Sequence, residues 1–333
     1  MDEKLSPYGG GFFMSHITSI LRFNIENLFI TLPQIWSSMA GQLKEVRNRI
    51  KSVQSTQQIT KAMKMVSAAK LRRAQDAIIQ MRPYASKLQE MLSNIVSNSE
   101  GGNAIALAEE RQVKKVLMIV VTSDRGLCGA YNANIQKMAI ATIAEKYAAV
   151  QAAGNLTIWA IGKKGAEFFQ KRGYNVDVRF KDTFLKLSFE TVQACAQAAV
   201  QAFKQKEFDA IEIVYSEFKN AATQRFASEV FLPIPKNEPS KGGSSKKSDF
   251  IFEPDKDLLI AELMPKILNT QLFKAVLDGN ASEHGARMTA MDKASENANE
   301  LLKSLKISYN RARQAAITTE LTEIVSGAAA LQG

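Results

Sequence analysis

The chain has 333 residues, 46% of them hydrophobic, and a formal net charge of +10. This length allows two domains, or one domain with an elongated element. The two cysteines, Cys128 and Cys195, form no CxxC motif, which excludes a disulfide framework and indicates a reducing compartment. The only histidines are His16 and His284, so we expect no metal site and no cofactor.

Residues 1–38 differ from the rest of the chain. Their apolar run contains Arg22, Glu26 and Pro33, whereas a membrane-spanning helix needs about 20 mostly apolar residues. The beginning Met-Asp-Glu-Lys also lacks the basic start of a signal peptide. We therefore expect an N-terminal extension that is not part of the fold, with Met39 as the working start. A membrane-touching tail is the alternative.

Residues 39–99 carry a long helical stripe. From Leu43 onward, apolar residues recur at intervals of three and four, as in a coiled coil. The seam becomes polar between Gln57 and Ser67, where a displaced apolar stripe resembles a stutter that locally rewinds a supercoil. The displaced stripe consists of Ile59, Met63 and Val66. Pro83 should kink this helix or divide it in two.

Residues 100–255 have the pattern of an α/β domain. Apolar runs of strand length alternate with helical patterns, which predicts a doubly wound, Rossmann-like sheet. We expect strands at 113–122, 156–161, 174–180 and 210–215, and helices at 132–151, 163–172 and 189–205. Residues 225–234 should add an antiparallel strand. A polar loop at 235–249 and a short return strand at 250–252 should follow.

Residues 256–333 carry the second stripe, which Pro254 and Pro265 should introduce. Gly279 and Gly285 should weaken the helix by up to about 1 kcal/mol each. The recurring residues are mostly small: Met291, Ala294, Ala298, Leu301, Leu305, Ser308, Ala312 and Ala315. Small residues let two helix axes approach closely. Because both stripes far exceed an ordinary helix, we expect a long antiparallel coiled coil of the terminal helices plus a Rossmann-like domain.

The positive charge lies mainly in the first stripe. Residues 39–99 contain eleven Lys and Arg against three acidic residues, a surplus of eight, whereas the segment from Lys256 onward has nine of each sign. The surplus favours an acidic partner, such as nucleic acid, anionic lipid or acidic protein loops. The acidic residues of the second stripe should lie on its solvated face: Glu283, Asp292, Glu296 and Glu300.

The sequence SDRGLCGAYN, which follows the first predicted strand, is the one candidate for chemistry in the α/β domain. A glycine-bearing turn before a helix can bind phosphate through free backbone N–H groups. However, the spacing of Gly126 and Gly129 matches neither GxGxxG nor GxxxxGK[ST]. We expect a tight strand-to-helix turn in which Asp124 and Arg125 satisfy the local backbone or each other. No other pattern predicts a catalytic group.

Two terminal segments carry a resemblance. They are MAGQLKEVRNRIKSVQSTQQITKAMKMVSAAKLRRA at 39–74 and YNRARQAAITTELTEIVSGAAAL at 309–331. Both closely resemble the γ subunit of F-type ATP synthases, as do SDRGLCGAYN and the segment DGNASEHGARMTAMDKASENANE at 278–300. The resemblance covers residues 39–333. The two cysteines are too far apart in sequence to be the short regulatory dithiol of chloroplast members, which favours a bacterial member.

The resemblance implies a non-catalytic rotor shaft. Its coiled-coil tip would sit inside a hexamer of three α and three β subunits, and its α/β domain would lie beside the ε subunit and the membrane c-ring. The basic helix would meet acidic loops of β. The chain would be peripheral to the bacterial plasma (inner) membrane, on the cytoplasmic side. By motif, the coupling positions are Met63 in KAMKMV, Arg313 and Gln314 in RARQAAI, and Thr318 and Glu320 in ITTEL.

Two other functions are compatible with parts of the sequence. A basic coiled coil could bind nucleic acid, with steep salt dependence, although the first helix has no aromatic residue before Tyr84 for base stacking. We therefore expect no nucleic-acid partner. The α/β domain could instead belong to a nucleotide-dependent enzyme, which would require nucleotide affinity in residues 110–255.

Overall fold

The computed structural model describes residues 11–97, 107, 111–221, 223–234 and 256–332; in the two long helices, side chains are described from Leu43 to Leu88, at Met91 and from Leu263 to Leu331. The chain forms two compact units, residues 60–293 and residues 1–59 together with 294–333. The predicted loop at 235–249 and the return strand at 250–252 lie outside the described residues.

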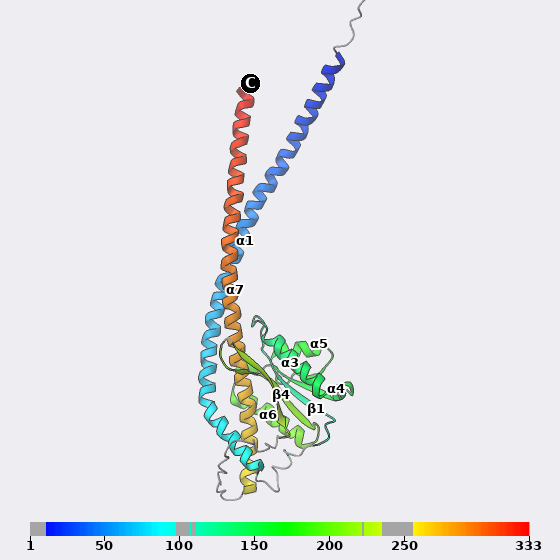
Figure 1. Ribbon diagram of the computed structural model, residues 1–333, viewed down its shortest axis with the longest axis vertical. Coiled ribbons are helices and arrows are strands. Elements are labelled where there is room, and N and C mark those ends of the chain that lie inside the picture. The colour runs from blue at the N-terminus through cyan, green and yellow to red at the C-terminus, as the bar shows by residue number, and fades with distance from the viewer. Residues whose placement is uncertain (1–10, 98–106, 108–110, 222, 235–255, 333) are drawn as a thin grey trace, which may run out of the picture. The chain divides into compact units, whose positions relative to one another are not determined.

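Two long helices belong to both units. Helix α1 spans Gly11–Ser97 and helix α7 spans Lys256–Gln332. Of the two outcomes predicted for Pro83, a kink or a division of the first helix, the division is wrong, because α1 is continuous there. The helix bends in the stretch drawn in cyan (Figure 1). Pro265 lies inside α7 rather than before it. A proline removes one backbone hydrogen bond, which a long, well-packed helix can lose by bending.

The seam of α1 keeps one heptad frame, so the predicted stutter is wrong. In the polar stretch, Thr60 and Ser67 are only 8% and 3% exposed, whereas Val66 of the displaced stripe is 57% exposed. The residues of this frame are all buried or half-buried: Leu43, Val46, Ile50, Val53, Gln57, Thr60, Lys64, Ser67, Leu71, Ala74, Ile78, Met81, Ala85 and Leu88. Polar residues therefore occupy the seam itself.

The seam of α7 differs from the prediction at every second position. Leu302 is 6% exposed and Leu301 is 41% exposed, although the pattern had favoured Leu301. The seam residues at this spacing, all buried or half-buried, are Met291, Ser295, Ala298, Leu302, Leu305, Tyr309, Ala312 and Ala316. The predicted Ala294 is half-buried beside Ser295. Neighbouring apolar pairs such as Leu301 and Leu302 fit the period equally well, so the pattern alone could not choose between them.

The α/β domain contains one five-stranded sheet in the order β3-β2-β1-β4-β5. The strands are β1 at Val116–Val121, β2 at Leu156–Ile161, β3 at Asn175–Asp177, β4 at Ala210–Phe218 and β5 at Gln224–Leu232. Four strands are parallel and β5 pairs antiparallel with β4, which confirms the predicted doubly wound sheet with an added antiparallel strand. The continuous apolar run of β1 is buried on both faces.

Helices cover both faces of the sheet (Figure 1). They are α3 at Tyr131–Lys146, α4 at Ala148–Ala152, α5 at Lys163–Lys171, the 3₁₀ helix η1 at Thr183–Lys186 and α6 at Phe189–Lys204. Side chains of α3, α4 and α5 share one core cluster with one face of the sheet. On the other face, α6 packs beside α7, whose Leu268, Leu272 and Val276 are fully buried. The helix that carries the second stripe is thus also a layer of the α/β domain.

Candidate functional site

The two long helices are antiparallel and share one register in both units. In the first unit, Arg47 Nη2 donates a hydrogen bond of 2.9 Å to the Tyr309 hydroxyl, and this contact lowers the pKa of Tyr309. In the second unit, Lys64 Nζ lies 2.5 Å from Asp292 Oδ1. Arg47 and Lys64 are as far apart in α1 as Tyr309 and Asp292 are in α7. The contacts confirm the predicted antiparallel pairing.

Residues 57–67 of α1, here called the inverted segment, have their polar and apolar sides exchanged. Thr60, Lys64 and Ser67 occupy the seam, whereas Ile59 and Met65 are 59% and 73% exposed. The Ser67 hydroxyl donates to the Met63 carbonyl at 2.7 Å, so its polar group is satisfied within the helix. A local conflict of this kind between pattern and packing is expected where a surface has a second role.

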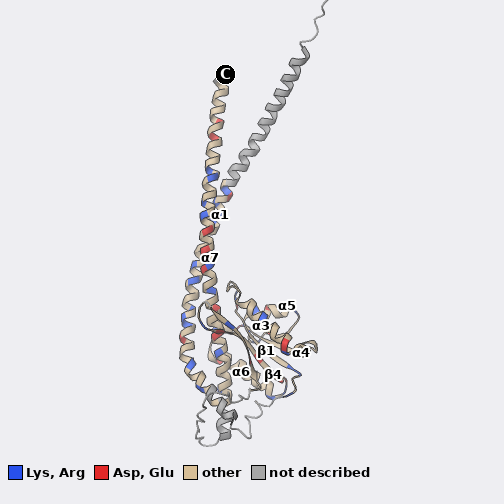
Figure 2. Ribbon diagram, in the orientation of Figure 1, with Lys and Arg blue, Asp and Glu red and all other residues tan. Residues whose placement is uncertain are grey.

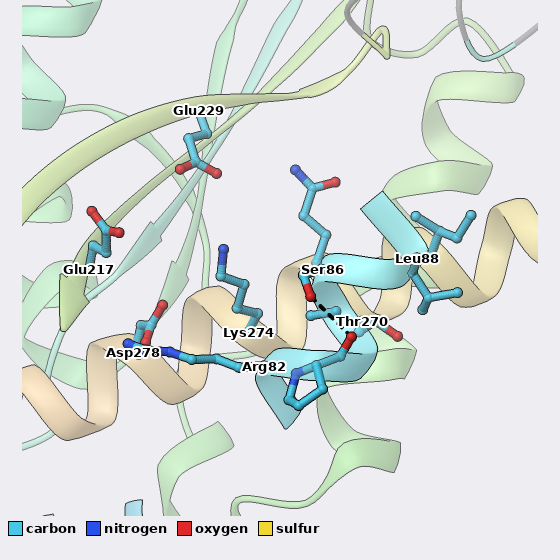
Figure 3. A pocket seen from close by; sticks show the side chains of 12 residues that line it. Arg82, Ser86, Leu88, Glu217, Glu229, Thr270, Lys274 and Asp278 are labelled. Carbon is cyan, nitrogen blue, oxygen red and sulfur yellow. Dashed lines mark hydrogen bonds between the residues drawn. The ribbon is translucent and has the colours of Figure 1, made fainter. Parts of the chain in front are cut away.

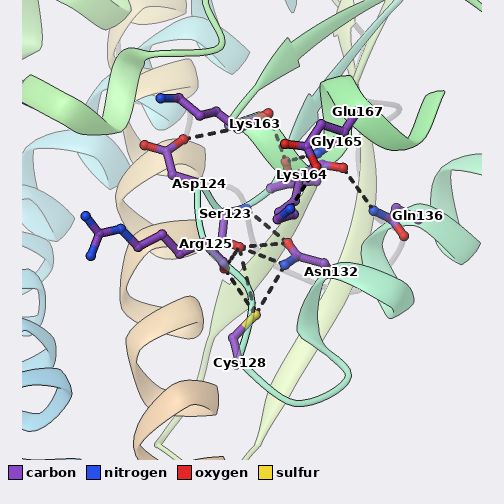
Figure 4. A network of polar contacts seen from close by, with 12 residues as sticks. Ser123, Asp124, Arg125, Cys128, Asn132, Gln136, Lys163, Lys164, Gly165 and Glu167 are labelled. Carbon is purple, nitrogen blue, oxygen red and sulfur yellow. Dashed lines mark hydrogen bonds and ion pairs between the residues drawn. The ribbon is translucent and has the colours of Figure 1, made fainter. Parts of the chain in front are cut away.

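The turn after β1, residues 123–130, is held by its own polar groups (Figure 4). Ser123 N donates to Asn132 Oδ1 at 3.0 Å, and Ser123 Oγ donates to the Arg125 carbonyl at 2.7 Å. Asp124 Oδ1 accepts from Lys163 N at 3.2 Å, so the aspartate satisfies the backbone at the start of α5 and not, as we had expected, that of its own turn. These contacts hold the β1–α3 turn in place, which supports a structural role for this glycine-bearing loop.

Helix α7 approaches the end of β1 closely. At Gly279, a Cβ atom would lie 2.9 Å from Val121 Cγ1, and the Gly279 carbonyl accepts a hydrogen bond of 2.8 Å from the Tyr131 hydroxyl. At Gly285, a Cβ atom would lie 3.1 Å from the Ala221 carbonyl oxygen. The two glycines that we expected only to weaken the helix therefore allow its backbone to lie against the sheet domain.

A buried ion pair on α7 holds the β1–α3 turn. Arg287 Nη1 pairs with Glu283, and Arg287 Nη2 donates to the carbonyls of Arg125 and Gly126 at 3.0 and 3.2 Å. Both charged side chains are buried. The assignment of Glu283 to the solvated face is therefore wrong. Asp292, which was assigned to the same face, is half-buried and pairs with Lys64, whereas Glu296 and Glu300 are exposed as predicted. Helical periodicity did not identify this pair, because it treats every acid outside the seam as solvated.

These contacts place α7 where open α/β sheets bind ligands. In the order β3-β2-β1-β4-β5, the chain changes direction across the sheet between β1 and β4, and ligands bind outside the carboxyl ends at such a switch point. Here Gly279 of α7 lies against Val121, the last residue of β1, and Ser282 Oγ donates to the Ser216 carbonyl of β4 at 3.2 Å. The crevice is filled by the chain's own helix.

His284 lies beside this ion pair. Burial and the charges of Arg287 and Lys70 lower the pKa of His284 to about 4. The imidazole is therefore neutral at physiological pH and cannot act as a charged acid there. Within the described ranges, no group of three or more His, Cys, Asp or Glu side chains is arranged to hold a metal ion.

A cavity of about 800 Å³ lies between α1, β4, β5 and α7 (Figure 3). Its charged lining comprises Arg82, Glu217, Glu229, Lys274 and Asp278. Asp278 is 3% exposed, and burial raises the pKa of its carboxyl group to about 6. The charges of Lys274 and Arg82 oppose this rise, while those of Glu217 and Glu229 add to it. The folded chain therefore holds the proton on Asp278 up to a higher pH than the unfolded chain does.

We expect Asp278→Asn to stabilise the chain at neutral pH. Because the carboxyl pKa is higher in the folded state, the free energy of unfolding of the parent should fall as the pH rises from about 4 to about 6, by up to about 3 kcal/mol. The asparagine variant should lack this loss. Urea unfolding of the full chain across this range would measure it. A parent more stable than the variant above pH 6 would contradict the assignment.

The predicted coupling residues lie in different units, and each is described in its own. Met63 is half-buried at the edge of the α1 seam. Arg313, Gln314, Thr318 and Glu320 are exposed on α7. The Thr318 hydroxyl donates to the Gln314 carbonyl at 2.9 Å, one turn earlier in the same helix. The C-terminal positions thus present their side chains outward, available to a partner.

Comparison with known proteins identifies the family. A sequence model of the ATP synthase family matches residues 42–331. A curated ATP synthase gamma chain from Cytophaga hutchinsonii is 54% identical over 290 residues, covering 87% of this chain and 98% of that protein. The chain belongs to the ATP synthase gamma-chain family. A second gamma chain, from Chlorobium phaeobacteroides, is 50% identical over 293 residues, covering 87% of this chain and 99% of the relative.

Solved structures share the fold of the family. A chain of the Euglena gracilis mitochondrial ATP synthase, in a structure that comprises OSCP, F1 and the c-ring, superimposes with a TM-score of 0.60 at 20% identity, covering 88% of this chain and 95% of that one. A chain from the rotor structure of the same enzyme gives a TM-score of 0.57 at 21% identity, covering 84% and 99%. The predicted fold class is confirmed.

Family membership confirms the predicted function. A gamma chain is the non-catalytic central-stalk subunit of ATP synthase, a complex whose F1 part is peripheral to the membrane. Among the described helices, none is long and apolar enough to cross a membrane. The nucleic-acid-binding and nucleotide-dependent alternatives find no support in these relatives.

Proposed function

We propose that this chain is the rotor shaft that couples ion flow through a membrane c-ring to the β subunits of an F1 hexamer. Residues 39–99 and 256–333 form the shaft, and residues 100–255 form the domain that meets the ε subunit and the c-ring. Residues 1–38 are an extension that precedes the family match at 42–331, although α1 already begins at Gly11. The complex would lie on the cytoplasmic side of a bacterial plasma membrane, because the relatives with about 50% identity are bacterial.

The observation that carries this proposal is the continuity of α7. One helix from Lys256 to Gln332 packs on the sheet, is bonded to the β1–α3 turn through Arg287, and pairs with α1 through Tyr309. A force applied to the sheet is therefore delivered to α7 through a buried ion pair and close backbone packing. Such a connection suits a subunit that transmits rotation.

The outer side of the inverted segment fits the proposed contact with acidic loops of β. Ala62, Met65, Val66 and Ala69 form an exposed apolar stripe on α1, and the exposed cations Lys61, Lys70 and Arg73 flank it. Lys and Arg recur along α1 with few acids between them (Figure 2). Exposed ion pairs contribute about 0–1 kcal/mol each, so many weak contacts can break and re-form as the shaft turns.

The mechanism requires no catalytic group in this chain. A partner shifts a conformational equilibrium only through its different interaction with the two states. We infer that Met63 meets the loops of β and that Arg313 and Gln314 contact the upper catalytic region of β. By motif, Thr318 and Glu320 are the positions that couple the C-terminal helix to the KAM segment. The exposure of the four C-terminal residues supports these roles.

Rotation of the chain inside its own hexamer tests the proposal. A probe attached through Leu185→Cys, at a residue 71% exposed on the α/β domain, should rotate when the assembled F1 complex hydrolyses ATP. Arg313→Ala should leave assembly intact and lower rotation-linked hydrolysis. The native cysteines are buried, so the parent chain is the labelling control. Hydrolysis at the full rate with a stationary probe would refute the proposal.

A further inference from the structure

We propose that the Lys64–Asp292 ion pair fixes how α1 is rotated about its own axis, so that the apolar side of the inverted segment faces outward. The two charges meet across the seam, with Lys64 Nζ 2.5 Å from Asp292 Oδ1. Both residues therefore act as positioning residues for the contact with β. The identity of that partner rests on the proposed function, whereas the rotational setting itself does not.

The inverted segment contains two faces that could pack against α7. The observed face presents Thr60, Lys64 and Ser67, and the face one residue earlier presents Ile59, Met63 and Val66. Successive residues are separated by about 100° around a helix, so a rotation of about this size would exchange them. Hydrophobic burial alone favours the second face, because it would remove Ile59 and Val66 from water.

The ion pair favours the polar face, which is the one that packs. A lysine at a seam position specifies one arrangement of a coiled coil at some cost in stability. Opposite Lys64, Asp292 is half-buried, as is Lys64 itself, so rotation of α1 would leave a partly desolvated carboxylate without its partner. The small residue Ser67 is buried in this part of the seam and offers little apolar area to oppose the rotation.

Thiol accessibility in the full-length chain measures this rotation directly. A Val66→Cys reporter should react readily with a maleimide, and a Ser67→Cys reporter should react slowly, because their parent residues are exposed and buried respectively. Adding Asp292→Asn or Lys64→Gln should speed labelling at position 67 by up to about threefold, the change in the equilibrium that an ion pair of this exposure can produce. Labelling at position 66 should slow by a smaller factor, because the observed face is the main one in the parent chain.

Exchanging the charges provides the decisive comparison. The double variant Lys64→Asp/Asp292→Lys should restore the labelling rates of the parent, whereas either single reversal should not. Lys61→Gln removes the same charge from the exposed side of α1 and should leave both rates unchanged. If the Ser67→Cys chain does not fold, Thr60→Cys offers a second buried seam position. Unchanged rates in the single variants, or no recovery in the exchanged one, would overturn the inference.

A separate experiment tests the role of the Lys64–Asp292 ion pair in the assembled complex. In assembled F1Fo, Asp292→Asn should reduce the proton transport driven per ATP hydrolysed, and the exchanged pair should recover it. If the labelling rates change and transport does not, the rotational setting is established but the contact with β lies elsewhere on the shaft. If the probe at Leu185→Cys stays stationary during ATP hydrolysis and so refutes the rotor function, the thiol-labelling result still stands.

Discussion

Replacing Arg287 with alanine should lower the free energy of unfolding by about 3–5 kcal/mol. The change would leave the buried Glu283 carboxylate without its partner and would remove both hydrogen bonds to the carbonyls of the β1–α3 turn. Burial already raises the pKa of Glu283, and the charge of Arg287 opposes that rise. Without the arginine, Glu283 should therefore become protonated more readily. Urea unfolding of the full chain would measure the loss.

Two further variants separate the ion pair from a general effect of losing an arginine. Arg313→Ala removes an exposed arginine from the same helix and should change stability by less than about 0.5 kcal/mol. Glu283→Gln combined with Arg287→Met removes both charges and should recover part of the loss, because no uncompensated charge remains buried. Equal losses from Arg287→Ala and Arg313→Ala would show that the buried ion pair contributes nothing.

Gly162→Ala should destabilise the α/β domain by a similar amount, about 3–5 kcal/mol. Gly162 has a φ angle of +100°, which is unfavourable for any residue with a side chain. Its added Cβ would also lie 2.4 Å from the Thr122 carbonyl oxygen, a backbone atom of the adjoining segment that cannot move independently. Moving either Gly162 or the Thr122 carbonyl to relieve this clash would displace α5 from the end of β1. Thermal or urea unfolding would detect the loss.

Gly154 provides the matched control. It also has a positive φ angle, +73°, but a Cβ there would have no atom within 4 Å. Gly154→Ala should therefore show only the conformational part of the cost, about 1 kcal/mol. The difference between the two variants isolates the close approach of Gly162 to Thr122. If the two losses were equal, the contact with the Thr122 carbonyl would not matter.

The large-scale architecture could be predicted because it rests on length and period. Two stripes far longer than an ordinary helix, separated by alternating strands and helices, are compatible with few folds. The boundaries of α6, for example, were predicted to within one residue, because Ser188 accepts from Thr191 N as an N-cap and the apolar period is clear. The heptad frame of α1 from Leu43 to Val53 was equally legible.

The joint between α7 and the sheet could not be predicted in the same way. Gly279 and Gly285 carry no side chain, so a periodicity analysis registers only their poor helix propensity and not the contact that they permit. Glu283 and Arg287 are buried because they satisfy each other and the β1–α3 turn, which depends on tertiary placement. The packing face of the inverted segment was also predicted wrongly, because a periodicity analysis assumes that apolar residues mark the seam. The coupling residues predicted by motif, such as Arg313, stay predictions.

The shared register of the two helices restricts how the length of this subunit can change in evolution. Arg47 with Tyr309 and Lys64 with Asp292 are matched pairs at two levels of the same antiparallel helix pair. An insertion in α1 between those levels would shift one pair against the other unless α7 gained an equal number of residues between Asp292 and Tyr309. Insertions and deletions in the two terminal helices should therefore occur together, whereas the surface turns of the sheet domain are free to vary on their own.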